Sequence, residues 1–334
     1  MLRVGILGTG SMGSTHAVGW GATPVALAGF FSLDAPRAAS LTAQHGGRVY
    51  DSMEALIADV DVVDICTPTH LHHPLILACA AAGKAVICEK PLARTAAQGL
   101  EAVEACERAG VPLLVAHVVR FFPEYAAAKQ IVDSGEIGQV AVVRLTRASY
   151  QPKPAPDANW FLDPTKSGGM MLDLMIHDFD YARWVAGEVI SVYARGVRAK
   201  RPDAPEDYAL AILRHADGAI SNIEGGWAYP PPMFRTALEI AGSGGLIEHP
   251  AGVSQPLAFY PKRKPGDNAP EVGLPGSPLH ESPYTAEIRH FYDVLTKGVT
   301  PRVTARDGLA ALRIGLAAIR SAETGQQVRV EDIQ

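Results

Sequence analysis

The residues best suited to acid–base chemistry lie in SGGMMLDLMIHDFDYARWVAGE, which we predict to be one helix from Ser167, near its N-cap, to Gly187 at its end. In this helix Asp173 and His177 stand at i and i+4, and Asp180 follows three residues later, so the three share one face. An aspartate one turn before a histidine can orient the imidazole and hold one tautomer. The other ring nitrogen can then exchange a proton with a hydroxyl. The alternative is a purely structural histidine.

A second cluster is the glycine pattern GxGxxG, formed by Gly8, Gly10 and Gly13. It directly follows the first apolar run and opens a predicted helix, which is the context of a dinucleotide-binding loop. The first glycine allows a tight turn, the second lets the backbone approach a pyrophosphate, and the third lets helix and strand pack closely. The phosphates are then expected at the helix N-terminus.

The end of the second predicted strand, GFFSLDAPRA, bears on the type of cofactor. An acid at this place binds the ribose 2′-hydroxyl of NAD, whereas a small polar residue with a nearby arginine accepts the 2′-phosphate of NADP. Ser32 with Arg37 favours NADP, and Asp34 could restore a preference for NAD. The sequence therefore predicts NAD(P) without deciding between the two forms.

Lys90 follows the apolar run AVI in CEKPLA, at the end of a predicted strand. Ligands of parallel sheets bind at the carboxyl ends of the strands, so Lys90 is expected beside the nicotinamide, although a solvated surface lysine is the alternative. TPTHLHHP follows another strand and is expected to start a loop over the cofactor. The expected cofactor-binding residues are Gly8, Thr9, Gly10, Ser11, Met12, Gly13, Ser32, Arg37, Thr67, Pro68, His72, Glu89 and Lys90.

The elements that must position these residues change in character along the chain. Through residue 118, short apolar runs alternate with helical segments, which predicts a doubly wound parallel Rossmann sheet. Beyond it, QVAVVRLTRASY alternates in polarity, and DYALAILRHADGAISNIEGGWA predicts two strands joined at Asp217-Gly218. We therefore expect an α/β chain with an NAD(P)-binding domain at 1–118 and an α+β substrate and oligomerisation domain at 119–334, whose open sheet is large and mostly antiparallel. Whether the last helices pack on the first domain is open.

Composition excludes several other classes of protein. The chain has 334 residues, 48% of them hydrophobic, and a formal net charge of −5, which gives no reason to expect nucleic acid or an anionic membrane. Its apolar runs are shorter than a membrane span. Four scattered cysteines without a CxxC pattern indicate buried thiols and a reducing, cytoplasmic location. The histidines of HLHH lack a matching set of carboxylates or cysteines, so no metal is expected.

The motifs, in this order and spacing, resemble one known family. GxGxxG, TPTHLHH, EKP, VVRFFPEY and GGMMLDLMIHDFD are similar to those of the glucose–fructose oxidoreductase/inositol dehydrogenase/rhizopine-catabolism (Gfo/Idh/MocA) family, and the similarity covers essentially the whole chain. The motif around His177 most resembles that of myo-inositol 2-dehydrogenases. The chain departs from many members by Ser32 in place of an acid, by the missing asparagine in VAHVVRFFP, and by Met175 in place of a glycine.

The resemblance implies an NAD(P)-dependent dehydrogenase acting on CH–OH groups (EC 1.1.1.-) of a small cyclic polyol or sugar, with Lys90, Asp173 and His177 as catalytic residues. Arg120, Asn159, Trp160, Asp173 and His177 are the expected substrate-binding residues, and a homodimer or homotetramer is expected. Another substrate, such as an aldose, an amino-sugar or a trans-dihydrodiol, is an open alternative. A catalytically silent NAD(P)-binding regulator is an alternative of a different class.

Overall fold

The computed structural model describes residues 1–152, 160–198, 206–249 and 281–334. The described residues fall into two compact units, one drawn from Met1–Phe121 and Ser277–Leu309 and the other from Phe122–Gly276 and Ala310–Gln334. Helix α11 (Ala305–Thr324) begins in the first unit and continues in the second. The Pro-rich stretch at roughly 250–283 lies mostly outside the described residues. Within the described ranges, no helix is both long and apolar enough to span a bilayer.

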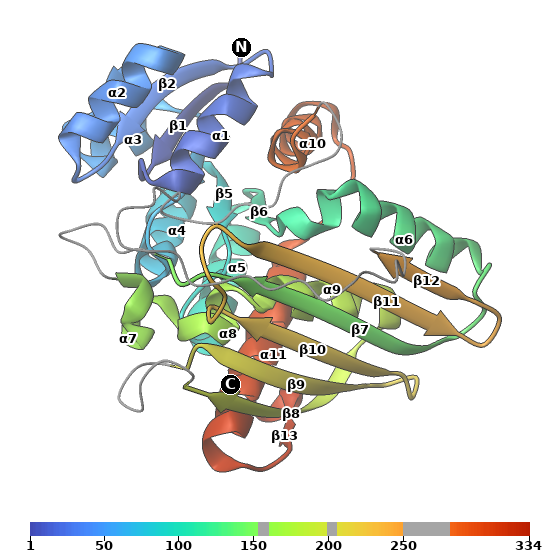
Figure 1. Ribbon diagram of the computed structural model, residues 1–334. Coiled ribbons are helices and arrows are strands. Elements are labelled where there is room, and N and C mark those ends of the chain that lie inside the picture. Colours follow the sequence, from blue (N-terminus) through green and yellow to red (C-terminus); the bar gives the residue numbers. More distant parts are fainter. Residues whose placement is uncertain (153–159, 199–205, 250–280) are drawn as a thin grey trace. The chain divides into compact units, whose positions relative to one another are not determined.

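The first unit is a parallel sheet with helices around it (Figure 1). Its elements are β1 (Arg3–Leu7), α1 (Ser11–Gly21), β2 (Ala26–Phe31), α2 (Ala35–His45), β3 (Arg48–Val49), α3 (Met53–Asp59), β4 (Val62–Ile65), η1 (Thr69–Leu71), α4 (His72–Ala81), β5 (Ala85–Glu89), α5 (Ala96–Ala109), β6 (Leu113–Ala116), η2 (Val118–Phe121) and α10 (Pro283–Lys297).

The strand order in this sheet is β3-β2-β1-β4-β5-β6, and every neighbouring pair is parallel. This is the doubly wound arrangement, and the order reverses between β1 and β4. The loops that follow β1, β4 and β5 therefore leave the sheet at one edge beside the reversal, where ligands of such sheets bind. The expected Rossmann sheet is confirmed.

The sheet strands are apolar because helices cover them. Val4, Ile6, Phe30 and Ile87 are buried in one core cluster. Burial on both faces explains why these strands are continuous apolar runs rather than alternating ones. The same cluster includes Ile288 of α10, which packs so closely on α1 that a Cβ at Gly19 would lie 2.8 Å from the Ile288 side chain.

The second unit is built on a mixed sheet. Its other elements are α6 (Pro123–Ser134), β7 (Val140–Ser149), η3 (Trp160–Leu162), α7 (Pro164–Ser167), α8 (Gly169–Asp173), α9 (Ile176–Ala186), β8 (Val189–Val197), β9 (Tyr208–His215), β10 (Ile220–Gly226), β11 (Phe234–Gly242), β12 (Leu246–His249), β13 (Val328–Arg329) and η4 (Val330–Asp332).

The seven strands follow the order β12-β11-β7-β10-β9-β8-β13, and only the pair β7–β10 is parallel. The hairpin predicted at Asp217-Gly218 joins β9 to β10, and Gly218 adopts φ +91°, which favours glycine. The large, mostly antiparallel sheet is thus confirmed. Helices α8, α9 and the second part of α11 lie over one face of it (Figure 1).

The expectation of one unbroken helix from Ser167 to Gly187 is wrong. Ser167 ends α7 and is not an N-cap, and its buried hydroxyl bonds the carbonyl of Phe161. The remaining stretch forms α8 and α9, separated at Leu174 and Met175. The backbone N–H of Met175 bonds the carbonyl five residues back, at Met170, which interrupts the helical ladder. The expected i,i+4 relation of Asp173 and His177 therefore spans a helix junction.

Candidate functional site

The glycine loop after β1 has the local geometry that a dinucleotide requires. Gly8 adopts φ +98°, and a Cβ there would lie 2.5 Å from the Cys66 carbonyl oxygen. A Cβ at Gly13 would lie 2.1 Å from the Gly8 carbonyl oxygen. A Cβ at Gly10, by contrast, would meet nothing within 4 Å. Gly8 and Gly13 are therefore needed by the chain itself, whereas Gly10 borders open space that a phosphate can enter.

The N-terminus of α1 carries the donors for such a phosphate. Gly10 is its N-cap residue and offers no side-chain acceptor to the first N–H groups of the helix. The adjacent Thr9 is 4% exposed, and its hydroxyl has no hydrogen-bond partner among the described residues. A buried hydroxyl of this kind and a row of helical N–H groups fit an anionic ligand. The loop thus suits the pyrophosphate of an NAD-type cofactor.

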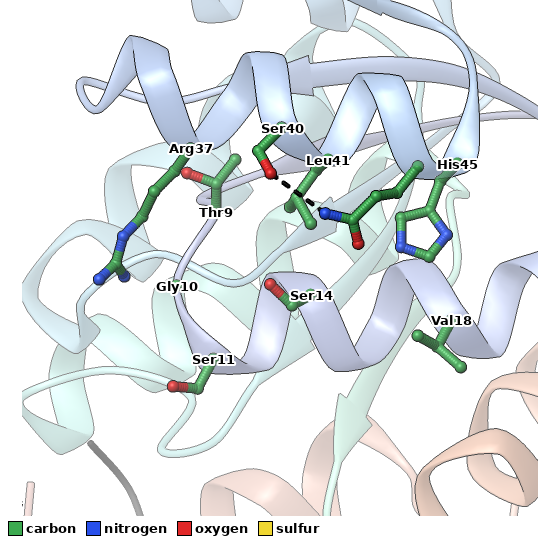
Figure 2. Close-up of a pocket in the computed structure, with 10 residues that line it drawn as sticks. Thr9, Gly10, Ser11, Ser14, Val18, Arg37, Ser40, Leu41 and His45 are labelled. Carbon is green, nitrogen blue, oxygen red and sulfur yellow. Dashed lines mark hydrogen bonds between the residues drawn. The ribbon is translucent and has the colours of Figure 1, made fainter. Parts of the chain in front are cut away.

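A pocket of about 300 Å³ adjoins this loop (Figure 2). It lies between α1 and α2, which contribute Ser11 and Ser14 on one side and Arg37 and Ser40 on the other. The complete lining is Thr9, Gly10, Ser11, Ser14, Val18, Arg37, Ser40, Leu41, Gln44 and His45. Hydroxyls and a guanidinium around a shallow apolar floor fit a polar ligand group that continues from the phosphates.

Three residues that bear on the choice between NAD and NADP lie at the end of β2. Asp34 is the N-cap of α2, and its carboxylate accepts a hydrogen bond from the Arg37 N–H at 3.0 Å. The same carboxylate lies 3.3 Å from the Arg37 Nε, and both side chains are about half exposed. The Ser32 hydroxyl accepts the Asp34 N–H. The carboxylate and the guanidinium therefore meet at this strand end.

The loops after β4 and β5 are joined by His72. Its Nδ1 lies 2.8 Å from the Pro91 carbonyl oxygen and its Nε2 lies 2.9 Å from the Thr67 carbonyl oxygen. Burial lowers the pKa of His72, so the neutral ring donates its one N–H to one of these carbonyls. The histidine thus ties the TPTHLHH loop to the EKP loop. Pro68, in the same loop, begins the short helix η1.

Glu89 and Lys90 stand at the end of β5. Glu89 is 6% exposed, and its Oε2 accepts the backbone N–H of Lys90 at 3.0 Å. The pair thus stands at the carboxyl edge of the parallel sheet, like the glycine loop. Sequence reasoning did not identify two further polar residues beneath this edge, His16 of α1 and Asp64 of β4, which are both fully buried. Two features of the sequence could have indicated these residues: Asp64 is a charged residue within the apolar run VVDI, and His16 lies on the helix that follows the glycine loop.

Asp173 and His177 belong to the second unit, in α8 and α9 respectively, and both are partly exposed. Directly after His177 stands a residue that sequence reasoning missed, Asp178. Asp178 is fully buried and accepts two hydrogen bonds from Arg147, at 2.7 and 3.1 Å. Burial raises the pKa of Asp178 and Arg147 opposes that rise. This buried pair holds α9 against β7.

Three further expected substrate residues have different surroundings. Arg120 is 2% exposed and donates to the Arg302 carbonyl oxygen at 2.8 Å, with Asp307 at 3.5 Å. These contacts indicate a structural function, and its contact with substrate stays a prediction. Trp160 stacks on Phe161 with ring centroids 3.9 Å apart. Asn159 lies outside the described residues.

Comparison with known proteins gives matches along most of the chain. The profile of an oxidoreductase family with an NAD-binding Rossmann fold (GFO_IDH_MocA) matches residues 2–117, and the GFO/IDH/MocA C-terminal domain matches residues 125–248. An inositol 2-dehydrogenase of Rhizobium meliloti (strain 1021) is 33% identical over 98% of this chain and 99% of its own length. A 1,5-anhydro-D-fructose reductase of Ensifer adhaerens is 29% identical over 99% of each chain.

A solved structure gives a similar result. GenD2 from gentamicin A biosynthesis, crystallised in complex with NAD, is 27% identical, with a TM-score of 0.83 over 98% of this chain and 96% of that one. The described strand order and the matched Rossmann profile agree on the NAD-binding domain.

Proposed function

Because the chain belongs to the Gfo/Idh/MocA family of oxidoreductases, we propose that it oxidises a hydroxyl carbon of a cyclic polyol or sugar and delivers the hydride to NAD(P). It is a dehydrogenase of CH–OH groups with an NAD-binding Rossmann domain. The observation that carries the choice of a cyclic polyol is the similarity to an inositol 2-dehydrogenase along 98% of this chain. The open space at Gly10 supports the cofactor assignment.

We propose the following roles for the residues of this chain. The cofactor, when bound, supplies the hydride acceptor. The α1 N-terminus and the Thr9 hydroxyl hold its phosphates. His177 takes the proton of the substrate hydroxyl as general base, and Asp173 orients its ring. Lys90 donates a hydrogen bond to the same oxygen and stabilises the negative charge that develops there.

The remaining expected residues keep lesser roles in this proposal. Thr67, Pro68, His72 and Glu89 line the cofactor side of the strand ends after β4 and β5. Ser11, Met12, Ser32 and Arg37 stay candidates for contact with the cofactor. Arg120, Asn159 and Trp160 stay candidates for substrate contact.

Two alternatives follow from the comparisons and the sequence. The reductase of 1,5-anhydro-D-fructose supports a sugar as substrate in place of an inositol. An aldose, an amino-sugar or a trans-dihydrodiol is likewise an alternative substrate. A catalytically silent NAD(P)-binding regulator is the alternative of another class. The presence of Lys90, Asp173 and His177 in this chain favours the enzyme.

We also propose that the second unit assembles with further copies of the chain through the outer face of its sheet. On this face six large apolar side chains are 37–53% exposed, namely Ile190, Tyr193, Val197, Leu210, Ile212 and Ile220. They come from the neighbouring strands β8, β9 and β10, where Tyr193 pairs with Ile212. A contiguous apolar patch of this kind is characteristic of a protein interface.

A substrate screen tests the proposed activity. Purified protein is mixed with NAD⁺ or NADP⁺ and, in turn, with inositols, aldoses, amino-sugars and dihydrodiols, and the absorbance of the reduced cofactor is followed. The reverse reaction is run with the reduced cofactor and the corresponding ketones. We expect turnover with a cyclic polyol or sugar. Binding of the cofactor without turnover on any compound in either direction would support the regulator.

A further inference from the structure

A chain of buried ionisable groups runs beneath the loops at the carboxyl edge of the parallel sheet. His16 of α1 is fully buried, and its Nδ1 lies 2.9 Å from Asp64 Oδ2. On the opposite side of the ring, Nε2 lies 3.2 Å from Glu89 Oε1. One imidazole therefore bridges two carboxylates that come from neighbouring strands, β4 and β5.

Two more groups complete this network. The Trp20 indole, one turn after His16 on α1, donates to Asp64 Oδ2 at 2.8 Å. The Cys66 sulfur lies 3.4 Å from His16 Nδ1 and 3.5 Å from Asp64 Oδ1. His16, Asp64 and Cys66 are residue types that bind metals. However, ligands of a tetrahedral zinc stand about 3.4 Å apart, given metal–ligand distances of about 2.1 Å. The 2.9 Å contact between His16 and Asp64 is therefore a hydrogen bond.

The surroundings make His16 a cation. Burial opposes the charged ring, but the carboxylate of Asp64 and the nearby Cys66 outweigh it and raise the pKa of His16 well above its ordinary value. The charged ring hydrogen-bonds Asp64 through Nδ1 and lies within ion-pair distance of Glu89 at Nε2, where it makes no hydrogen bond with a described residue. Without this cation, the buried carboxylates of Asp64 and Glu89 would each lose the positive charge beside them, which is strongly unfavourable.

The network continues to the backbone of Lys90. One oxygen of Glu89 faces His16, and the other accepts the N–H of Lys90 at 3.0 Å. The Glu89 carboxylate therefore pairs with the charge of His16 through one oxygen and bonds the backbone of Lys90, from which the Lys90 side chain projects, through the other. Position errors of about 1 Å at a reacting group can lower turnover by about two orders of magnitude.

We propose that His16 is a positioning residue for Lys90, acting through Glu89. This inference rests on the proposed function, because it assigns His16 a purpose only if Lys90 takes part in the reaction. His16 itself contacts neither the reacting atoms nor solvent, and it acts by holding Glu89 in place. The substitution that tests it is His16→Gln, which removes the cation but retains a polar side chain.

His16→Gln should lower kcat by at least about tenfold and change the dissociation constant of NAD⁺, measured by fluorescence, by less than about threefold. Trp20→Phe is the matched control, because it removes another bond to Asp64 from the same helix and leaves Glu89 untouched. It should keep kcat near the wild-type value even if the melting temperature falls. If kcat falls in proportion to the melting temperature in both variants, the role of His16 is only structural and the inference is wrong.

A double-mutant cycle separates this inference from the proposed function. In a Lys90→Ala background, His16→Gln should cause little further loss of kcat. An equal loss in both backgrounds would overturn the positioning role while leaving Lys90 catalytic. Wild-type turnover of Lys90→Ala alone would instead overturn the assignment of Lys90. If His16→Gln fails to fold, Glu89→Gln, which removes the charge facing His16, should show the same fall in kcat, and its absence would contradict the inference.

Discussion

Asp34 has two functions in the local structure of the first unit. It caps α2 by accepting the Arg37 N–H, and it forms an ion pair with the Arg37 guanidinium. A capping side chain of this type stabilises a helix by about 1 kcal/mol, whereas a half-exposed ion pair contributes less. The carboxylate matters more for the ligand: its negative charge repels a 2′-phosphate and engages the arginine that would bind one. We therefore expect NAD to be preferred over NADP.

Asp34→Ser tests this preference while keeping the helix cap, since serine caps a helix about as well as aspartate. The variant should raise the ratio of kcat/KM with NADP⁺ to kcat/KM with NAD⁺ by at least about tenfold, because Arg37 becomes available to the 2′-phosphate. Arg37→Ala in the same background should remove the gain. A ratio that does not change with Asp34→Ser would show that this strand end does not select the cofactor.

At the scale of the element, the glycine loop and α1 act as one unit. Gly8 and Gly13 are constrained by the backbone they contact, and their roles could be predicted from their spacing together with their place between the first strand and the first helix. Gly10 is different, because a Cβ there meets only open space and its backbone, at φ −71° and ψ −167°, suits any residue. Alanine at this position is therefore compatible with the fold but intrudes on the place of the pyrophosphate.

Gly10→Ala should raise the dissociation constant of NAD⁺ by at least about tenfold and leave the melting temperature unchanged within about 2 °C. The control is Gly21→Ala at the other end of α1, where a Cβ also meets nothing within 4 Å. It should change neither quantity. Wild-type affinity for NAD⁺ in Gly10→Ala would mean that the phosphates do not approach this turn.

The elements that sequence could predict are those specified by local patterns. The parallel strands, the Gly110 stop of α5 in the left-handed conformation and the hairpin at Gly218 follow from apolar runs and glycines. The break between α8 and α9 could not be predicted, because it depends on a distant contact. The Met175 side chain packs tightly on Gly225 of β10: a Cβ added to Gly225 would lie 2.3 Å from the Met175 side chain.

Contacts between residues that are distant in the sequence also explain which site residues were missed. His16 and Asp64 are 48 residues apart in the chain, and only the order of β1, β4 and β5 brings them together. Helix α6 and the short β3, β13 and α3 were also not predicted. A strand of two residues, such as β3 or β13, is too short for a periodicity to be detected.

At the scale of the whole molecule, we propose that another copy of the chain covers the exposed apolar face of the second unit. Exposed side chains are suitable for mutation because their replacement does not disturb the core. Ile212 is 39% exposed in the middle of the patch, with the uncharged residues Tyr193 and Asn222 opposite it on the neighbouring strands. A charge at this position would be buried without a partner in an assembly and harmless in a monomer.

Ile212→Lys should therefore convert the protein from an oligomer to a monomer in sedimentation equilibrium, with an unchanged circular dichroism spectrum. Leu33→Lys is the control, since Leu33 is 95% exposed and lies in the first unit outside this face. It should leave the assembly intact. A wild-type protein that sediments as a monomer at all concentrations would contradict the proposed interface.

The proposed catalytic roles also draw on the whole chain, because Lys90 belongs to the first unit and His177 to the second. The most direct measurement is the turnover of Lys90→Ala and His177→Ala on the substrate found in the screen, with NAD(P) affinity measured in parallel. Controls are Lys297→Ala and His249→Ala, which change exposed residues of the same types. We expect each site variant to lose turnover by about 10²–10⁴-fold and to retain cofactor binding. Wild-type turnover in either variant would contradict the role proposed for that residue.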